Sequence, residues 1–166
     1  MALGLVLELE RLGGPARPLP VAIKWPNDLY VEGRKLAGLL PRLRFRGGRV
    51  RWAQLGLGLN GINRVSPGAI ALGDVLQRPA GRGGRRFDPR ATPRALEGLA
   101  QRALERTLAL ADQPERVRRA VEQRLWQQPE GIARGGVLWR IDGLECDGGL
   151  RVLGPTGQQD VWRRDF

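Results

Sequence analysis

The feature that most constrains the fold is a series of short apolar segments, separated by turn residues, between residues 21 and 59. VAIKW at 21–25 ends at Pro26-Asn27-Asp28, and later turns are expected at Glu32-Gly33-Arg34 and Gly47-Gly48. Turns this close together reverse the chain before a helix can form, so neighbouring segments pair as antiparallel strands. In the last segment Leu55, Leu57 and Leu59 alternate with small or polar residues, as in a half-buried strand.

Three segments have the periodicity of helices. Residues 3–12 are apolar at helical spacing and end at Gly13-Gly14. Thr92-Pro93 supplies a capping hydroxyl and a proline at the first helical position, and Pro114 opens a further helix. The expected core residues are Leu96, Leu99, Ala100, Ala103, Leu104 and Leu108 of the first of these, and Val117, Ala120, Val121 and Leu125 of the second. Residues 60–91 are expected to be mostly loop.

After Gly131 the pattern changes to short strands separated by glycine turns. The sequence therefore predicts an α+β fold with a main domain over 1–130 and a small β domain over 131–166. The small domain is too short to be stable alone, so we expect it to pack on the larger part.

Composition excludes several classes of function. The chain has 166 residues and no histidine, which removes catalytic histidine bases and histidine-ligated zinc. Its single cysteine, Cys146, cannot form an internal disulfide, so a cytoplasmic location is expected. No apolar run is long enough to span a membrane. The net charge of +11 raises nucleic-acid binding as an alternative, but arginines are scattered along the chain and solvated arginine is favoured.

Lysine is rare in this arginine-rich chain. Of 28 basic residues only Lys24 and Lys35 are lysine, and both lie in KWPNDLYVEGRKLAG at 24–38. This segment, followed by LGLGLNGIN at 55–63, resembles the biotin protein ligases in motif order and spacing. The tail IDGLECDGGLRVLGPTGQQDVW is similar to the small SH3-like C-terminal domain of that family. The resemblance implies a partial class II synthetase-like mixed or antiparallel sheet with flanking helices, followed by an SH3-like β-barrel.

The resemblance also implies an activity and a site. Biotin protein ligases join biotin to the α-phosphate of ATP, forming biotinyl-5'-AMP, and then transfer biotin to a lysine of the carboxyl carrier protein of acetyl-CoA carboxylase. Lys35 matches the family's lysine beside biotin and the mixed anhydride. A compact ammonium fits between two oxygens where a planar guanidinium would be too broad. Asp28 is implied to orient a lysine or a phosphate-bound metal, and it is the second catalytic candidate.

The nucleotide is expected to contact several further residues. Gly56 and Gly58 would leave room for it, and Asn60 matches a side chain near ATP and its Mg²⁺, an ion that prefers oxygen ligands. Asn27 and Trp25 are additional binding candidates. Structural alternatives stay open: Asn27 and Asp28 as turn formers, Trp25 as core or pocket wall, and the glycines as close-packed backbone.

Two other features have competing interpretations. Lys24 is expected to pair with Asp28 across the turn, with a role near ATP or the acceptor as the alternative. The stretch Gly81–Arg86 looks like the family's Gly-Arg loop, but it follows KWPND where the family's loop precedes it, so a flexible basic loop is favoured.

Only 23 residues precede Lys24, whereas the resemblance implies roughly a hundred more residues there. The chain is therefore expected to correspond to the C-terminal half of a catalytic domain plus the small domain, with self-association or a missing N-terminal half as a consequence. The alternatives to a ligase are a catalytically inactive remnant that binds carrier protein or nucleotide, and a basic nucleic-acid binder.

Overall fold

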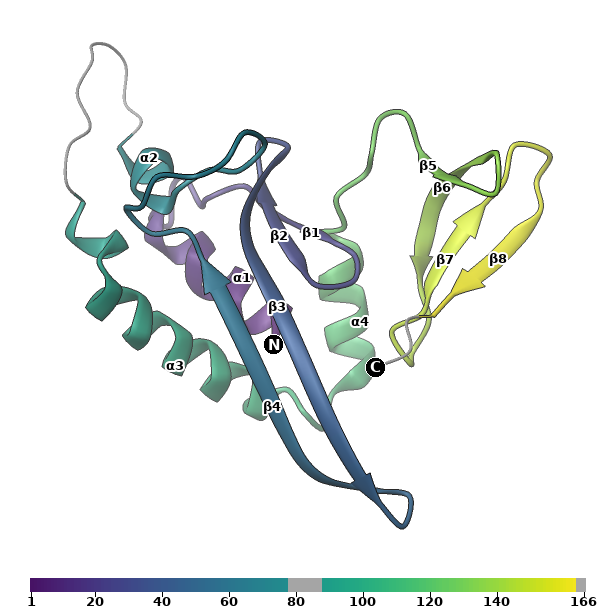
Figure 1. Cartoon of the computed structure of the whole chain (residues 1–166), viewed down its shortest axis with the longest axis horizontal. Helices are drawn as coiled ribbons and strands as arrows, with labels where there is room; N and C mark the ends of the chain where they lie inside the picture. The colour runs from purple at the N-terminus through teal and green to yellow at the C-terminus, as the bar shows by residue number, and fades with distance from the viewer. Residues whose placement is uncertain (78–87, 164–166) are drawn as a thin grey trace.

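The computed structural model describes residues 1–77 and 88–163, and it shows an α+β fold with two antiparallel sheets (Figure 1). The first sheet has the order β1-β2-β3-β4, with β1 at Val21–Lys24, β2 at Asp28–Val31, β3 at Arg34–Arg46 and β4 at Arg49–Leu59. The predicted hairpins are confirmed, since β2 and β3 join at residues 32–33 and β3 and β4 join at Gly47-Gly48.

Four described helices accompany this sheet: the first lies against its strands, the third packs on the first, and the fourth packs on the first and on the C-terminal sheet. They are α1 (Ala2–Leu12), α2 (Leu72–Leu76), α3 (Pro93–Ala109) and α4 (Pro114–Glu122), with a 3₁₀ turn at Pro89–Ala91 before α3. In Figure 1, α1 lies behind the sheet and the face of β3 and β4 toward the viewer carries no helix. The buried core joins α1, the sheet, α2 and α3 through Leu5, Val6, Leu9, Ile23, Leu29, Val31, Leu36, Ile70, Leu72 and Leu99.

Helix α3 begins as the sequence predicts. The Thr92 hydroxyl accepts a hydrogen bond from the Ala95 amide at 3.4 Å, and Pro93 is the first helical residue. The predicted core face was wrong at its end, because Leu104 and Leu108 are exposed while Leu99 and Ala103 are buried. Helix α1 packs on α3 through Ala103 and Thr107 as well, so Leu104 and Leu108 lie on the side of α3 that faces away from α1. The segment 60–91 was predicted as loop, and in its described part it also contains α2 and the 3₁₀ turn.

The second sheet is a meander in the order β5-β6-β7-β8, with strands at Ile132–Arg134, Val137–Leu144, Leu150–Leu153 and Gln159–Trp162. It has its own small core of Leu125, Leu144, Leu150, Val152 and Trp162. The described strands pair only with their sequence neighbours, so the SH3-like barrel that the resemblance implies is not confirmed. No helix in the described ranges has the length and apolar character needed to cross a bilayer.

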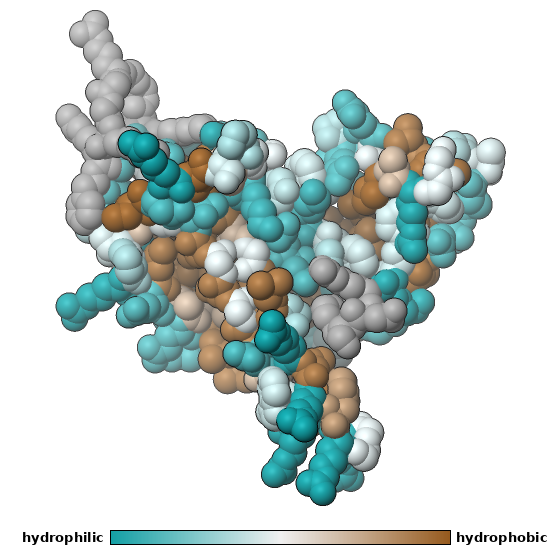
Figure 2. Space-filling view, viewed as in Figure 1, coloured by the Kyte–Doolittle hydropathy of each residue, from teal (hydrophilic) through white to brown (hydrophobic). Residues whose placement is uncertain are grey.

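The ends of β3 and β4 extend beyond the core as a two-stranded ribbon (Figure 1). All residues from Arg42 to Gly56 are exposed, whereas Leu39, nearer the base of β3, is buried. Hydrophilic side chains gather at the tip of this ribbon, with apolar ones among them and toward its base (Figure 2). A ribbon exposed on both faces is marginally stable by itself, so its base depends on the core below it.

An ion cluster ties α1 to α3. Glu8 is only 5% exposed, and its carboxylate accepts hydrogen bonds from Arg102 Nε at 2.9 Å and from Arg106. Burial by itself raises the pKa of this carboxyl, but the hydrogen bonds from Arg106 and Arg102 outweigh burial, so the pKa lies below its usual value. The charged form of Glu8 is therefore the one that stabilises the helix pair.

We expect Glu8→Gln to lower the free energy of unfolding at pH 7 by about 1–3 kcal/mol, the range for a hydrogen bond to a charged group. Because the folded pKa is depressed, the stabilisation is complete above the unfolded value of about 4.3 and is lost as the pH falls through the folded value. Urea unfolding at a series of pH values should show a flatter acid limb for this variant. Glu97→Gln, at an exposed site on α3, is the control; equal changes in both variants would contradict the role of Glu8.

Candidate functional site

The candidate site lies on the open face of the first sheet and centres on one ion pair. Lys35 Nζ lies 2.7 Å from Asp28 Oδ1, and the two side chains are 45% and 28% exposed. Asp28 begins β2 directly after the Pro26-Asn27 turn, and Lys35 is the second residue of β3. The pair is therefore accessible to a ligand and yet anchored on two hydrogen-bonded strands.

A β-bulge places Lys35 on this face. Leu29 pairs with Ala37 and Tyr30 pairs with Lys35, so Leu36 is an extra residue on β3. Leu29 and Val31 point into the core, which leaves Asp28 and Tyr30 on the open face. Lys35, opposite Tyr30, shares that face with Asp28.

The backbone of Lys35 also forms hydrogen bonds with the loop that follows β4. Its amide donates to the Gly68 carbonyl at 2.9 Å, and its carbonyl accepts from the Ile70 amide at 2.9 Å. The same carbonyl accepts a hydrogen bond from Asn60 Nδ2 at 3.3 Å. The loop that follows β4 therefore pins the start of β3 and fixes where the Lys35 side chain emerges.

Asn60 directly follows β4 and lies beside the Lys35 backbone. Its backbone amide donates to the Leu36 carbonyl at 3.0 Å, and its side-chain NH₂ group donates to the Lys35 carbonyl at 3.3 Å. Its side-chain oxygen has no protein partner among the described residues, so it is the atom available to a ligand or to a phosphate-bound cation. No group of three or more potential metal-binding side chains occurs in the described part of the chain.

Glycines make the floor of the open face. Gly38 lies opposite both Asp28 and Gly58, and Gly56 lies opposite Leu40. A Cβ at Gly38 would lie 3.1 Å from Asp28 Oδ1 and 3.2 Å from Lys35 Nζ, so the ion pair packs directly over this glycine. At Gly56 and Gly58 a Cβ would meet nothing closer than 3.5 Å. The absence of side chains here leaves a flat surface on which a ligand could lie.

Lys24 does not pair with Asp28, and that prediction was wrong. Its ammonium lies 5.1 Å from the centre of the Tyr30 ring and 5.3 Å from that of Trp126, and it donates to the Tyr30 hydroxyl at 3.3 Å. The two rings stack with their centroids 4.8 Å apart. Although Lys24 and Asp28 are strand partners, Asp28 is engaged by Lys35 and the aromatic pair attracts Lys24.

Tyr30, Trp126 and Gly38 are parts of the site that the sequence analysis missed. Tyr30 could have been found, because it lies two residues after Asp28 on one strand and thus on the same face. Gly38 is visible only once the register of β2 with β3 is known. Trp126 follows α4 and reaches β1 through backbone hydrogen bonds of Arg124 and Trp126 with Ile23, and no local signal in the sequence predicts that contact.

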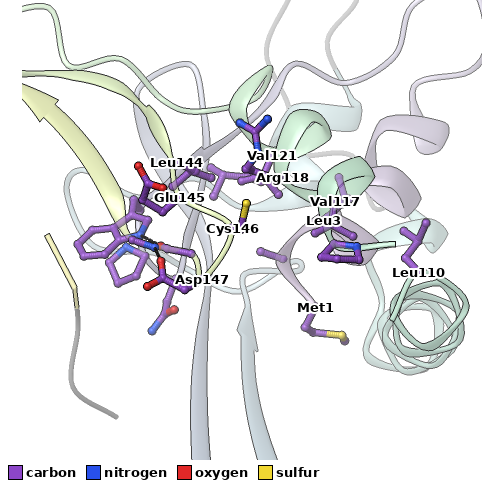
Figure 3. Close-up of a pocket in the computed structure, with 18 of the residues that line it drawn as sticks. Met1, Leu3, Leu110, Val117, Arg118, Val121, Leu144, Glu145, Cys146 and Asp147 are labelled. Atoms are coloured by element: carbon purple, nitrogen blue, oxygen red, sulfur yellow. Dashed lines mark hydrogen bonds between the residues drawn. The ribbon is translucent and has the colours of Figure 1, made fainter. Parts of the chain in front are cut away.

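Trp25 and Asn27 are directed elsewhere. Trp25 Nε1 donates to the Gly148 carbonyl at 3.0 Å, and its ring packs against the core of the second sheet. Both residues line a cavity of about 640 Å³ between the α1 N-terminus, α4 and the turn at 145–149 (Figure 3). Lys35, Asp28 and Asn60 do not line this cavity. Trp25 therefore lines the junction between the two sheets. The Asn27 carbonyl accepts a hydrogen bond from the Leu39 amide at 2.8 Å and so supports β3.

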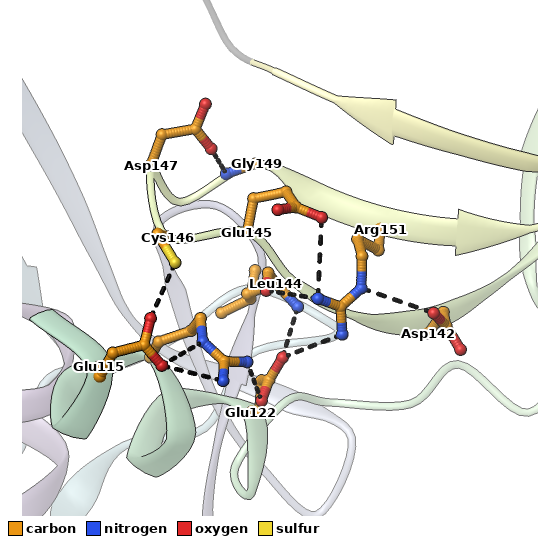
Figure 4. A network of polar contacts seen from close by, with 10 residues as sticks. Glu115, Glu122, Asp142, Leu144, Glu145, Cys146, Asp147, Gly149 and Arg151 are labelled. Carbon is orange, nitrogen blue, oxygen red and sulfur yellow. Dashed lines mark hydrogen bonds and ion pairs between the residues drawn. The ribbon is translucent and has the colours of Figure 1, made fainter.

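A polar network closes the same junction (Figure 4). Glu122 on α4 accepts from the Leu144 amide at 2.8 Å and pairs with Arg118 at 2.7 Å, and Arg151 on β7 approaches it at 3.4 Å. Cys146 donates to Glu115, which raises the pKa of its thiol. The thiol is thus held in its neutral form beside a carboxylate, where it is a poor nucleophile.

The comparisons with known proteins agree with this geometry. The Biotin/lipoate A/B protein ligase family matches residues 13–60. The bifunctional ligase/repressor BirA of Escherichia coli is 34% identical over 84 residues, which cover 49% of this chain and 25% of BirA. The biotin–[acetyl-CoA-carboxylase] ligase of Paracoccus denitrificans is 39% identical over 72 residues, covering 43% of this chain and 29% of that enzyme. Over these matched segments, which are only part of the chain, the comparisons support a member of the biotin protein ligase family.

The fold is similar to that of solved family members. The biotin protein ligase of Aquifex aeolicus in complex with biotin and ATP superposes with a TM-score of 0.63 and 20% identity, covering 96% of this chain and 66% of that one. Its apo structure gives a TM-score of 0.66. At this identity the likeness concerns the fold. The segment that matches the curated relatives spans about a quarter of their length. The match to the family model, at residues 13–60, includes Asp28, Lys35 and Asn60.

The Gly38 contact yields a test of the ion pair. We expect Gly38→Ala to displace the Lys35 ammonium, because the new methyl group would lie about 3.2 Å from Nζ. With only two lysines in the chain, lysine-selective ¹³C labelling gives two Cε signals. The Lys35 signal should shift and the Lys24 signal should stay. Gly56→Ala, whose Cβ has 3.5 Å of clearance, is the matched control and should move neither; an unchanged Lys35 signal in Gly38→Ala would disprove the packing described.

Proposed function

We propose that this chain carries the adenylate-binding part of an ATP-dependent biotin protein ligase. In this proposal biotinyl-5'-AMP forms on the open sheet face, and biotin passes to a lysine of the carboxyl carrier protein of acetyl-CoA carboxylase. The observation that supports it best is the accessible Lys35–Asp28 pair above Gly38, within the segment that matches the family. ATP, biotin and a phosphate-bound Mg²⁺ are the proposed ligands.

The chemistry requires a cation where this ammonium lies. A biotin carboxylate oxygen attacks the α-phosphorus of ATP, the bond to the β-phosphate oxygen breaks, and pyrophosphate leaves. Two anionic groups approach each other in this step, and a preorganised positive charge lowers its barrier. An ammonium has three donors, and Asp28 occupies one of them, which leaves two for a carboxylate oxygen and a phosphate oxygen.

The other residues have supporting roles in this proposal. Asp28 orients the Lys35 ammonium, and the side-chain oxygen of Asn60 faces a phosphate or the Mg²⁺ that ATP brings. Gly56 and Gly58 let the nucleotide lie close to the β4 backbone. In the second step the carrier lysine attacks the biotinyl carbonyl and AMP leaves, with Lys35 still beside the phosphate oxygen. A cytoplasmic location accords with the single thiol but stays a prediction.

A second candidate is a non-catalytic half-site. The matched segment covers only about a quarter of BirA and of the Paracoccus enzyme, so groups that those relatives use could lie outside it. Such a chain would bind nucleotide or carrier protein without forming the adenylate. The two candidates differ in one observable, the biotin-dependent release of pyrophosphate.

We expect the purified chain to catalyse biotin-dependent exchange of pyrophosphate into ATP in the presence of Mg²⁺. Lys35→Ala should lower the exchange rate at least about 100-fold, which corresponds to the loss of one preorganised electrostatic contact in the transition state. Lys24→Ala is the matched control and should retain most of the rate, because its ammonium contacts two aromatic rings and not the ion pair.

Calorimetric titration with ATP separates the alternatives. ATP binding without any exchange would favour the non-catalytic half-site. Undiminished exchange in Lys35→Ala would remove this lysine from the mechanism.

A further inference from the structure

The ribbon formed by the ends of β3 and β4 has a composition unlike the rest of the chain. From Gly33 to Gly73 there is no Asp or Glu, although the segment contains eight basic residues. Five of them, Arg42, Arg44, Arg46, Arg49 and Arg51, lie on the ribbon. All five are exposed, and none forms an ion pair with another described residue.

The clustering of these unpaired charges on one element distinguishes the ribbon from the other arginine-rich surfaces. Arg102, Arg118 and Arg151 are held in ion pairs, and arginines outside the ribbon that lack one, such as Arg94 and Arg140, lie on separate elements. The sequence analysis predicted that most arginines are individually solvated, because they are scattered along the chain. The fold instead gathers five unpaired guanidinium groups at the tip of one projecting element (Figures 1 and 2).

The strand register arranges these groups in a row. Arg42, Arg44 and Arg46 alternate along β3 and so share one face, with a spacing of about 6.7 Å between neighbours. Arg46 is opposite Arg49, and Arg44 is opposite Trp52. A register shift between Arg44 and Phe45 leaves Arg51 as an extra residue on β4. One face therefore carries four guanidinium groups and an indole ring.

Aromatic side chains accompany the cations. Trp52 is 45% exposed and Phe45 is 57% exposed. Trp52 lies opposite Arg44 and so on the cationic face, whereas Phe45, between Arg44 and Arg46, projects from the other face with its partner Val50. Cations combined with flat rings are the pattern by which proteins hold a phosphate backbone and stack on bases.

We propose that this ribbon binds nucleic acid through its backbone phosphates and bases. The guanidinium fork matches phosphate oxygens bidentately. A two-stranded β-ribbon also fits the major groove of a duplex, while Trp52, on the same face as the arginines, suits the unstacked bases of a single strand. The shared chemistry is the phosphate backbone, and separate probes distinguish the two forms. This binding is independent of the proposed ligase chemistry, because the ribbon tip carries none of its residues.

The test measures binding of the whole chain by fluorescence anisotropy. The probes are a labelled 20-base-pair DNA duplex of arbitrary sequence, a labelled 20-nucleotide oligothymidylate, and a labelled 20-residue polyglutamate as an acidic polypeptide. Salt is varied between about 50 and 200 mM, because displaced counterions make phosphate binding steeply salt-dependent. We expect dissociation constants for at least one nucleic acid in the micromolar range, and weaker binding of polyglutamate.

The decisive variant removes three charges from the row. Arg42→Gln/Arg44→Gln/Arg46→Gln should weaken nucleic-acid binding at least tenfold at about 100 mM salt and reduce the slope of log affinity against log salt by about two to three. The control Arg17→Gln/Arg94→Gln/Arg140→Gln has the same net charge, and its three arginines are exposed and lie outside the ribbon. It should stay within about threefold of the unmodified chain.

Trp52→Leu distinguishes the two forms of nucleic acid. A stacking role predicts about a tenfold loss for oligothymidylate and little change for the duplex. Equal losses in the two triple variants, or binding that does not respond to salt, would overturn the proposal. Polyglutamate binding as tight as DNA binding, lost with the same ribbon arginines, would assign the surface to an acidic protein instead and would also overturn it.

Discussion

The candidate site depends on one extra residue in β3. Without the bulge at Leu36, Ala37 would still face Leu29, but Lys35 would lie opposite Val31, on the side that packs against the helices. An ammonium placed there would be buried in an apolar core without a partner, which is strongly unfavourable. The bulge turns the side chain to the open face, where Asp28 lies on the neighbouring strand. A shift of one residue in the register of β3 therefore decides whether Lys35 is buried in the core or forms an accessible ion pair.

The layered architecture follows from the same sheet. Helices α1 and α3 cover the face that carries Leu29, Val31 and Leu39, and the opposite face keeps glycine where a ligand could approach. The segment after α4 then returns to β1, so that Trp126 stacks on Tyr30 beside the open face. Trp25, on the adjoining turn, is held by the second sheet. The small sheet therefore contacts the turn that carries Asp28, and the two sheets share one junction.

The sequence predicted those parts of the fold that local chemistry determines. Turn residues at 32–34 and 47–48 define the hairpins, and Thr92-Pro93 defines the start of α3, because each signal acts within a few residues. The motif resemblance implied that Lys35, Asp28 and Asn60 share a site; Lys35 pairs with Asp28, and Asn60 contacts the Lys35 backbone, while their role in a ligand site stays a prediction. The partner of Lys24 was wrong because its environment comes from Trp126, about a hundred residues away along the chain. The exposed end of α3 and the bulge at Leu36 depend likewise on packing and register, which hydrophobic periodicity does not encode.

The rarity of lysine in this chain has a physical explanation at both positions. At Lys35 the ammonium lies above Gly38, at a place where even a single added methyl group would come within 3.2 Å of the nitrogen. A planar guanidinium is broader and directs its donors in a fixed fork, so it could not keep the 2.7 Å contact with Asp28 and still leave donors free above the glycine floor.

At Lys24 a compact cation lies about equally far from two stacked rings while donating to the Tyr30 hydroxyl. On the ribbon, where the side chains project into solvent and no neighbour limits their width, every cation is arginine. At Lys35, therefore, the space above Gly38 favours a small cationic group over a guanidinium.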